Sequence, residues 1–201
     1  HGAALLGGDL ARGGDAWMLD VVAAGRALRP VLRSGARPGD ALWITGALGG
    51  AASAVRAWTS GAAPRDDARA RFVAPVPRLA AARALADRGL PSAMLDISDG
   101  LVADAGHLAA AGGVALEIDA EDVPVFPGAE RDDALAGGED YELLFTAAAG
   151  SVESVRAELE SAAGAPLRRI GRVAVGEGVR VFEDGRPLAL AHLGYDHFRD
   201  R

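Results

Sequence analysis

Residues 93–101 read Ala93-Met94-Leu95-Asp96-Ile97-Ser98-Asp99-Gly100-Leu101 and join an apolar run to two carboxylates and a hydroxyl. The apolar run predicts a strand over 93–97. Ligand sites of open α/β sheets lie where strands end, and Asp96, Ser98 and Asp99 would gather there the hard oxygen atoms that Mg²⁺ prefers. Ser98 or Asp99 could instead simply cap the helix that follows.

A second acidic segment lies about forty residues further along. Residues 137–145 read Gly137-Gly138-Glu139-Asp140-Tyr141-Glu142-Leu143-Leu144-Phe145. The apolar end of this segment predicts a strand over 141–147. Asp140 and Glu142 alternate with Tyr141, so these two carboxylates could fix the turn rather than bind a ligand.

Helical and strand-like stretches alternate through most of the chain. We expect further strands at 16–24, 42–45, 114–118, 169–175 and 179–182, and helices at 49–58, 67–72, 79–87, 101–111, 130–135 and 152–162. The last two strands are separated by Gly176-Glu177-Gly178, which predicts a hairpin. The pattern predicts an α/β fold of the α+β sandwich type, with a mixed sheet and flanking helices.

Composition excludes several classes of function. The net charge of −7 argues against a nucleic-acid-binding protein, which would show a basic face. The chain has no Lys, so it lacks a Walker-type phosphate loop, and it has no Cys, which excludes disulfides and thiol nucleophiles. No apolar run of membrane-spanning length is present, and we expect a cytoplasmic protein.

The order of the motifs resembles that of a known family. The segments DISDGL (96–101) and GGEDYELLF (137–145) look like those of thiamine-monophosphate kinase. That family belongs to the superfamily that also holds aminoimidazole ribonucleotide synthetase and selenophosphate synthetase. The supporting pieces, in order, are Gly7-Gly8-Asp9, Arg33-Ser34-Gly35-Ala36-Arg37-Pro38-Gly39-Asp40, Ile44-Thr45-Gly46-Ala47-Leu48-Gly49, Pro75-Val76-Pro77-Arg78 and Gly194-Tyr195-Asp196-His197-Phe198.

The resemblance implies a role for each matching residue. It implies that Mg²⁺ is bound by Asp9, Asp96 and Asp99, and that ATP is contacted by Gly8, Asp9, Arg33 and Ser98. It further implies that Glu139 and Tyr195 bind the substrate. One position departs from the pattern, because Leu10 stands where the family often has Thr.

Each of these residues also has a purely structural interpretation. Asp9 could belong to a plain glycine turn, and Arg33 could be a solvated surface cation. Glu139 could lie in an ordinary loop, and Tyr195 could close the core.

The resemblance implies transfer of the γ-phosphoryl group of ATP to thiamine monophosphate, with Mg²⁺, by direct in-line transfer. It also implies that residues 1–25 are the end of an N-terminal ATP- and Mg²⁺-binding domain, that 26–201 form an aminoimidazole ribonucleotide synthetase-like C-terminal domain, and that the whole protein dimerises through the former. No nucleic-acid or membrane partner is expected.

Two alternatives to this activity stay open. One is another ATP-dependent enzyme of the superfamily, against which the GGEDYELLF segment and the Gly194-Tyr195 ending speak; the lack of Cys also disfavours a thiol-dependent selenophosphate synthetase. The other is a non-catalytic binding fragment.

Overall fold

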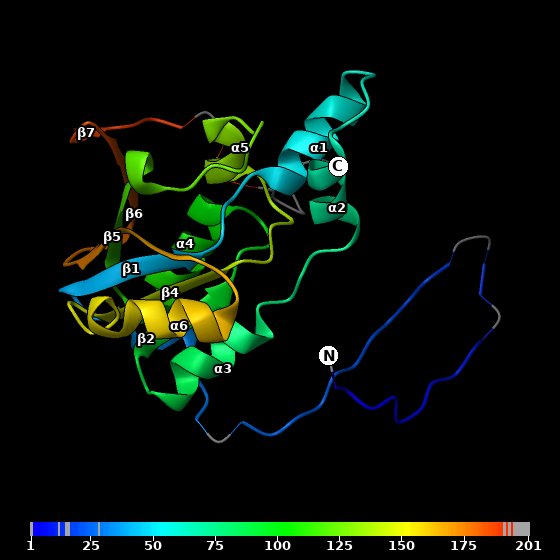
Figure 1. Cartoon of the computed structure of the whole chain (residues 1–201), viewed down its shortest axis with the longest axis horizontal. Coiled ribbons are helices and arrows are strands. Elements are labelled where there is room, and N and C mark those ends of the chain that lie inside the picture. The colour runs from blue at the N-terminus through cyan, green and yellow to red at the C-terminus, as the bar shows by residue number, and fades with distance from the viewer. Residues whose placement is uncertain are drawn as a thin grey trace.

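The computed structural model describes residues 2–11, 13–14, 17–27, 29–190, 192 and 194. The described residues before η1 (Arg33–Gly35) form no helix or strand, and they run as an extended segment beside the folded body (Figure 1, blue). The strand predicted for 16–24 is therefore wrong in this structure. Trp17, Met18 and Leu19 are exposed there, because a strand needs a neighbour to accept its backbone hydrogen bonds and no described strand pairs with this stretch.

The body is built on one seven-stranded sheet in the order β2-β4-β1-β5-β3-β6-β7. Its strands are β1 (Asp40–Thr45), β2 (Pro91–Asp96), β3 (Ala115–Asp119), β4 (Leu143–Ala148), β5 (Leu167–Ala174), β6 (Gly178–Glu183) and β7 (Arg186–Pro187). All neighbours are antiparallel except β3 and β6, which run parallel. The mixed sheet confirms the predicted α/β class.

The helices lie where the sequence pattern predicts them, within a few residues. They are α1 (Gly50–Thr59), α2 (Asp66–Val73), α3 (Leu79–Asp87), α4 (Leu101–Gly112), α5 (Arg131–Ala136) and α6 (Arg156–Ala163), with short 3₁₀ turns η2 (Ala120–Asp122) and η3 (Glu153–Val155). Among the described helices, none is both long and apolar enough to cross a membrane.

The sheet is covered on both faces. Along β1, Leu42 and Ile44 join the core that contains α4, whereas Trp43 joins the core beneath α3 and α6. Figure 1 shows α3 and α6 side by side on one face of the sheet. Because successive side chains of a strand point to opposite faces, an uninterrupted apolar strand requires two cores, and β1 is buried over its whole length for this reason.

The predicted hairpin of β5 and β6 does not form. Both strands exist, but β3 lies between them, antiparallel to β5 and parallel to β6. The turn at 175–177 therefore crosses the start of β3, where Ala115 pairs with both Ala174 and Gly178. A central position gives the buried β3 hydrogen-bonding partners on both of its edges, which direct pairing of β5 with β6 would deny it.

Candidate functional site

The loop after β2 carries three of the predicted site residues. Asp96 ends the strand and is exposed, whereas Ser98 and Asp99 are half-buried in the turn before α4. The N-cap position of α4 is Gly100, with no side-chain capping bond. Ser98 and Asp99 thus precede the N-cap position of this helix instead of occupying it.

The Gly137-Gly138 segment packs directly against this loop. The Glu139 backbone N–H donates to the Ser98 carbonyl at 2.8 Å, and the Tyr141 N–H donates to the Ile97 carbonyl at 2.8 Å. At Gly138 the approach is so close that a β-carbon would lie 2.4 Å from the Ser98 carbonyl oxygen. The glycine is required there because any side chain would push the two loops apart.

Glu139 and Tyr141 adopt left-handed backbone conformations, with φ of 67° and 50°. Such conformations are uncommon for residues with a side chain and concentrate at functional sites. The Tyr141 hydroxyl donates to Glu139 Oε2 at 3.1 Å, which holds the Glu139 carboxylate beside the loop of Asp99.

A cavity of about 650 Å³ opens between this pair of loops and residues of helices α1, α2 and α5. Ser98, Asp99 and Glu139 line it together, which joins three residues predicted from two separate motifs. One wall is apolar and the rim is acidic. The apolar wall comprises Ala51, Ala52, Val55, Phe72, Leu135 and Leu190, and the acidic rim adds Glu130, Asp132 and Asp133.

The site is electrostatically negative. Burial raises the pKa of the Tyr141 hydroxyl, and its hydrogen bond to Glu139 and the nearby charges of Asp96 and Asp99 raise that pKa further. These three carboxylates thus lie close enough to the phenol to affect it, and two of them, Asp99 and Glu139, also line the cavity. Oxygen donors gathered in this way fit a hard divalent cation such as Mg²⁺.

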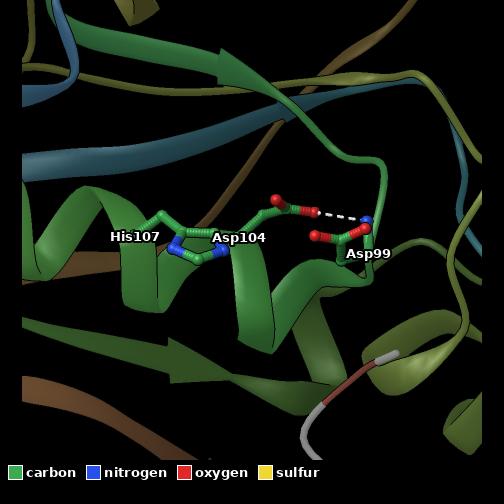
Figure 2. Close-up of side chains that lie close together, drawn as sticks. All are labelled: Asp99, Asp104 and His107. Carbon is green, nitrogen blue, oxygen red and sulfur yellow. Dashed lines mark hydrogen bonds between the residues drawn. The ribbon is translucent and has the colours of Figure 1, made fainter. Parts of the chain in front are cut away.

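Figure 2 shows how α4 meets the loop. Asp99, Asp104 and His107 can bring one ligand atom each within 4.8 Å of one another. Asp104 is buried, and its Oδ2 accepts the backbone N–H groups of Ser98, Asp99 and Gly100, at 2.9, 2.9 and 3.2 Å. Burial raises the pKa of the Asp104 carboxyl, which these hydrogen bonds partly offset.

Asp140 does not face the cavity. It is buried at the start of α1, where both carboxylate oxygens accept the Gly49 N–H at 3.1 and 2.9 Å. Burial raises its pKa from 3.8 to about 7. Asp140 thus fixes the turn, one of the two interpretations that the sequence left open.

Glu142 also has a structural role, and its partners explain the Pro75-Val76-Pro77-Arg78 motif. Its fully buried carboxylate receives Arg78 Nε at 2.7 Å and Nη2 at 2.5 Å, Arg71 Nη1 at 3.1 Å and the Thr45 hydroxyl at 2.6 Å. The Pro75-Val76-Pro77-Arg78 segment therefore anchors β4 through a two-pronged ion pair.

Two regions of predicted function lie apart from the cavity, and a third falls outside the described residues. Gly8 and Asp9 belong to the extended, exposed segment, where Asp9 Oδ1 accepts the Leu10 N–H at 2.8 Å. Exposed Arg33 lies in η1, whose Gly35 faces the Ser92 carbonyl, near the opposite end of β2 from Asp99. Tyr195 lies outside the described residues, although Gly194 before it lines the cavity.

The sequence analysis missed two contributors to the site. Asp104 looked like one more polar residue of an amphipathic helix, and only its six-residue spacing from Ser98 could have suggested contact. Arg56 on α1 pairs with Asp133 and Glu130, at 2.8 and 3.0 Å. This pairing partly neutralises the rim of the cavity.

Comparison with known proteins places the chain in a family. Residues 37–184 match the family described as "AIR synthase related protein, C-terminal domain". The chain is 36% identical over 214 residues to a thiamine-monophosphate kinase of Salmonella typhimurium, a match that covers 96% of this chain and 63% of that protein. The chain thus spans about three-fifths of the length of that relative.

Solved structures agree with this match. A thiamine-monophosphate kinase from Stenotrophomonas maltophilia K279a superposes with a TM-score of 0.71 at 39% identity, covering 79% of this chain and 54% of that one. A structure named "AaThiL complexed with AMPPCP and TMP" gives a TM-score of 0.69 at 33% identity, covering 85% and 55%. With a family match over most of its length and this shared fold, the chain belongs to the family of AIR synthase related proteins and carries their C-terminal domain.

Proposed function

We propose that the chain is part of an enzyme that transfers the γ-phosphoryl group of ATP to thiamine monophosphate, forming thiamine diphosphate and ADP. The observation that carries this proposal is the joining of Ser98, Asp99 and Glu139 around one cavity. The named relatives support the same choice. The neighbouring structure holds AMPPCP, an ATP analogue, together with TMP.

The donor set supports a role for Mg²⁺. Asp96 and Asp99 would hold the ion, and Asp9, which is exposed in the N-terminal segment of this structure, would be a further ligand once that segment docked at the site. When bound, Mg²⁺ would neutralise the phosphate charges of the two substrates. Glu139, whose carboxylate Tyr141 holds, would bind thiamine monophosphate at the cavity rim.

This chain would act by positioning. The attacking phosphate oxygen of thiamine monophosphate is already ionised near pH 7, so no residue need remove a proton. Ser98 would contact ATP while the loop at 137–139 holds thiamine monophosphate. Alignment of the ATP γ-phosphate with the acceptor phosphate would then accelerate the transfer. We propose direct in-line transfer because the attacking oxygen belongs to the substrate, so no enzyme nucleophile is required.

The test is an assay of the full-length protein with ATP, Mg²⁺ and thiamine monophosphate, followed by detection of thiamine diphosphate. Asp99→Asn should abolish product, whereas Glu117→Gln, on β3 and outside the cavity lining, should retain it. If the wild type forms no thiamine diphosphate but hydrolyses ATP with another acceptor, the thiamine assignment is wrong.

Further parts of the proposal concern the whole protein. We propose residues 1–25 as the end of an N-terminal ATP- and Mg²⁺-binding domain and 26–201 as the C-terminal domain. ATP contacts by Gly8 and Arg33, substrate contact by Tyr195, dimerisation through the N-terminal domain, a cytoplasmic location and the lack of nucleic-acid or membrane partners stay predictions.

A further inference from the structure

We propose that Asp104 is a positioning residue, whose carboxylate sets the conformation of the loop that presents Ser98 and Asp99 to the substrates. The proposal rests on the proposed phosphotransferase function for its catalytic consequence, but the loop geometry stands independently. No predicted ligand role includes Asp104.

The hydrogen bonds of Asp104 run backwards, from the helix to the loop that precedes it. A capping side chain ordinarily precedes its helix and accepts N–H groups from within the first turn. Asp104 is the fourth residue of α4, and its Oδ2 reaches backwards to three consecutive N–H groups that precede the helical residues. Its bonds therefore order the loop rather than the helix (Figure 2).

The three N–H groups belong to Ser98, Asp99 and Gly100, and the first two of these residues line the cavity. Two of them are the backbone donors of Ser98 and Asp99, so rotation of either peptide plane would break a bond to a charged acceptor. Hydrogen bonds to charged groups are about twice as strong as neutral ones. A single buried carboxylate thus restrains the backbone from which both functional side chains project.

The restraint extends to the other wall of the site. The Ser98 carbonyl accepts the Glu139 N–H at 2.8 Å, and Glu139 has a left-handed backbone. Asp104 on α4 and Glu139 before β4 thus hold opposite edges of the same peptide segment. Displacing Ser98 would also displace the backbone of Glu139 at the cavity rim.

Asp104 also belongs to the group of possible cation ligands with Asp99 and His107, but its Oδ2 is bound to the loop. Oδ2 of Asp104 is already surrounded by three N–H donors at 2.9 to 3.2 Å, and the side chain is buried, whereas Asp99 lines the cavity. A residue that supports a ligand through hydrogen bonds typically changes affinity or activity about 10- to 100-fold when it is replaced.

The experiment compares Asp104→Ala, Asp104→Asn and the control Glu117→Ala in the full-length protein. Glu117 is also a buried carboxylate with several partners, Arg172 and Arg180, but it lies on β3. Two quantities are measured for each variant: kcat with saturating ATP, Mg²⁺ and thiamine monophosphate, and amide hydrogen exchange of residues 97–101.

Asp104→Ala should lower kcat about 10- to 100-fold and accelerate exchange at 98–100. Asp104→Asn keeps one acceptor oxygen and should recover part of both. Glu117→Ala should change neither. The inference is overturned if exchange accelerates without loss of kcat, or if kcat falls while exchange is unchanged, since the latter outcome would mean direct action on substrate or metal.

A wild type without activity on thiamine monophosphate would refute the proposed function alone. Binding of Mg²⁺–ATP, measured by calorimetry, then decides the inference: binding at least tenfold weaker in Asp104→Ala than in Glu117→Ala supports it, and equal binding in the two variants overturns it.

Discussion

Replacing Asp140 by Asn should change how the stability of the protein depends on pH. Burial raises the pKa of this carboxyl from 3.8 to about 7. Between these values the unfolded chain is ionised at Asp140 while the folded protein keeps the proton. The unfolded state therefore binds fewer protons, and this group makes the free energy of unfolding fall as pH rises.

The size of the effect follows from the two pKa values. At about 1.4 kcal/mol per pH unit, the rise from 3.8 to about 7 amounts to about 4 kcal/mol of stability lost between pH 4 and pH 8. The amide introduced by Asp140→Asn cannot ionise, and its oxygen can still accept the Gly49 N–H. The variant should lose none of this stability. The difference in free energy of unfolding between variant and wild type should therefore grow by about 4 kcal/mol from pH 4 to pH 8.

The assay is urea unfolding of both proteins at pH 4, 5, 6, 7 and 8. Taking the difference between variant and wild type at each pH removes the contribution of the other carboxylates. Asp87→Asn, which removes an exposed carboxylate, is the control for the substitution itself. A difference between Asp140→Asn and wild type that stays constant from pH 4 to pH 8 would refute the argument.

Three further substitutions test the site and its supports. Arg78→Ala should cost about 3 kcal/mol in urea unfolding, because it leaves the buried Glu142 carboxylate with Arg71 as its single cation; a loss below about 1 kcal/mol would show that Arg71 suffices. Gly138→Ala should cost about 1 to 3 kcal/mol, since its β-carbon would lie 2.4 Å from the Ser98 carbonyl oxygen, whereas the control Gly106→Ala, with open space around it, should not destabilise. Asp99→Asn should weaken Mg²⁺ binding in a calorimetric titration, because it removes one carboxylate from the cavity lining; unchanged Mg²⁺ affinity would remove Asp99 from the ligand set.

The loops of the site could be predicted because their chemistry is local. Each of the two acidic segments contains its own strand, turn and candidate side chain within nine residues, so the residue pattern indicates Ser98 and Asp99, and the family resemblance adds Glu139. Their meeting at one cavity follows from the pairing of β2 with β4. That pairing is invisible in either segment alone.

The sequence analysis was wrong or incomplete where the structure of a segment depends on contacts with residues distant in the chain. The turn at Gly176 looks like a hairpin, but β3 competes for the edge of β5 and occupies it. The apolar stretch at 16–24 has the composition of a strand, and no described strand pairs with it. Asp104 and Arg78 have no distinctive sequence neighbours. Asp104 accepts N–H groups of the loop before its helix, and Arg78 pairs with Glu142, which is 64 residues away in the chain.

The order of strands in the sheet has a consequence for how the chain is made. None of the first three strands pairs with another of the first three: β1 pairs with β4 and β5, β2 with β4, and β3 with β5 and β6. Asp40 cannot pair with Ala148 until the ribosome has added about a hundred intervening residues, which takes roughly 5 to 20 seconds.

During that time Leu42, Trp43 and Ile44 have emerged before either of their partner strands, β4 and β5, has been synthesised. Pairings so distant along the chain also close slowly once they can form, because loop entropy must be lost before any contact is gained. The nascent chain therefore exposes for seconds a strand that is buried over its whole length in the folded protein, which makes it a natural client for chaperones that bind extended apolar segments until β4 leaves the ribosome.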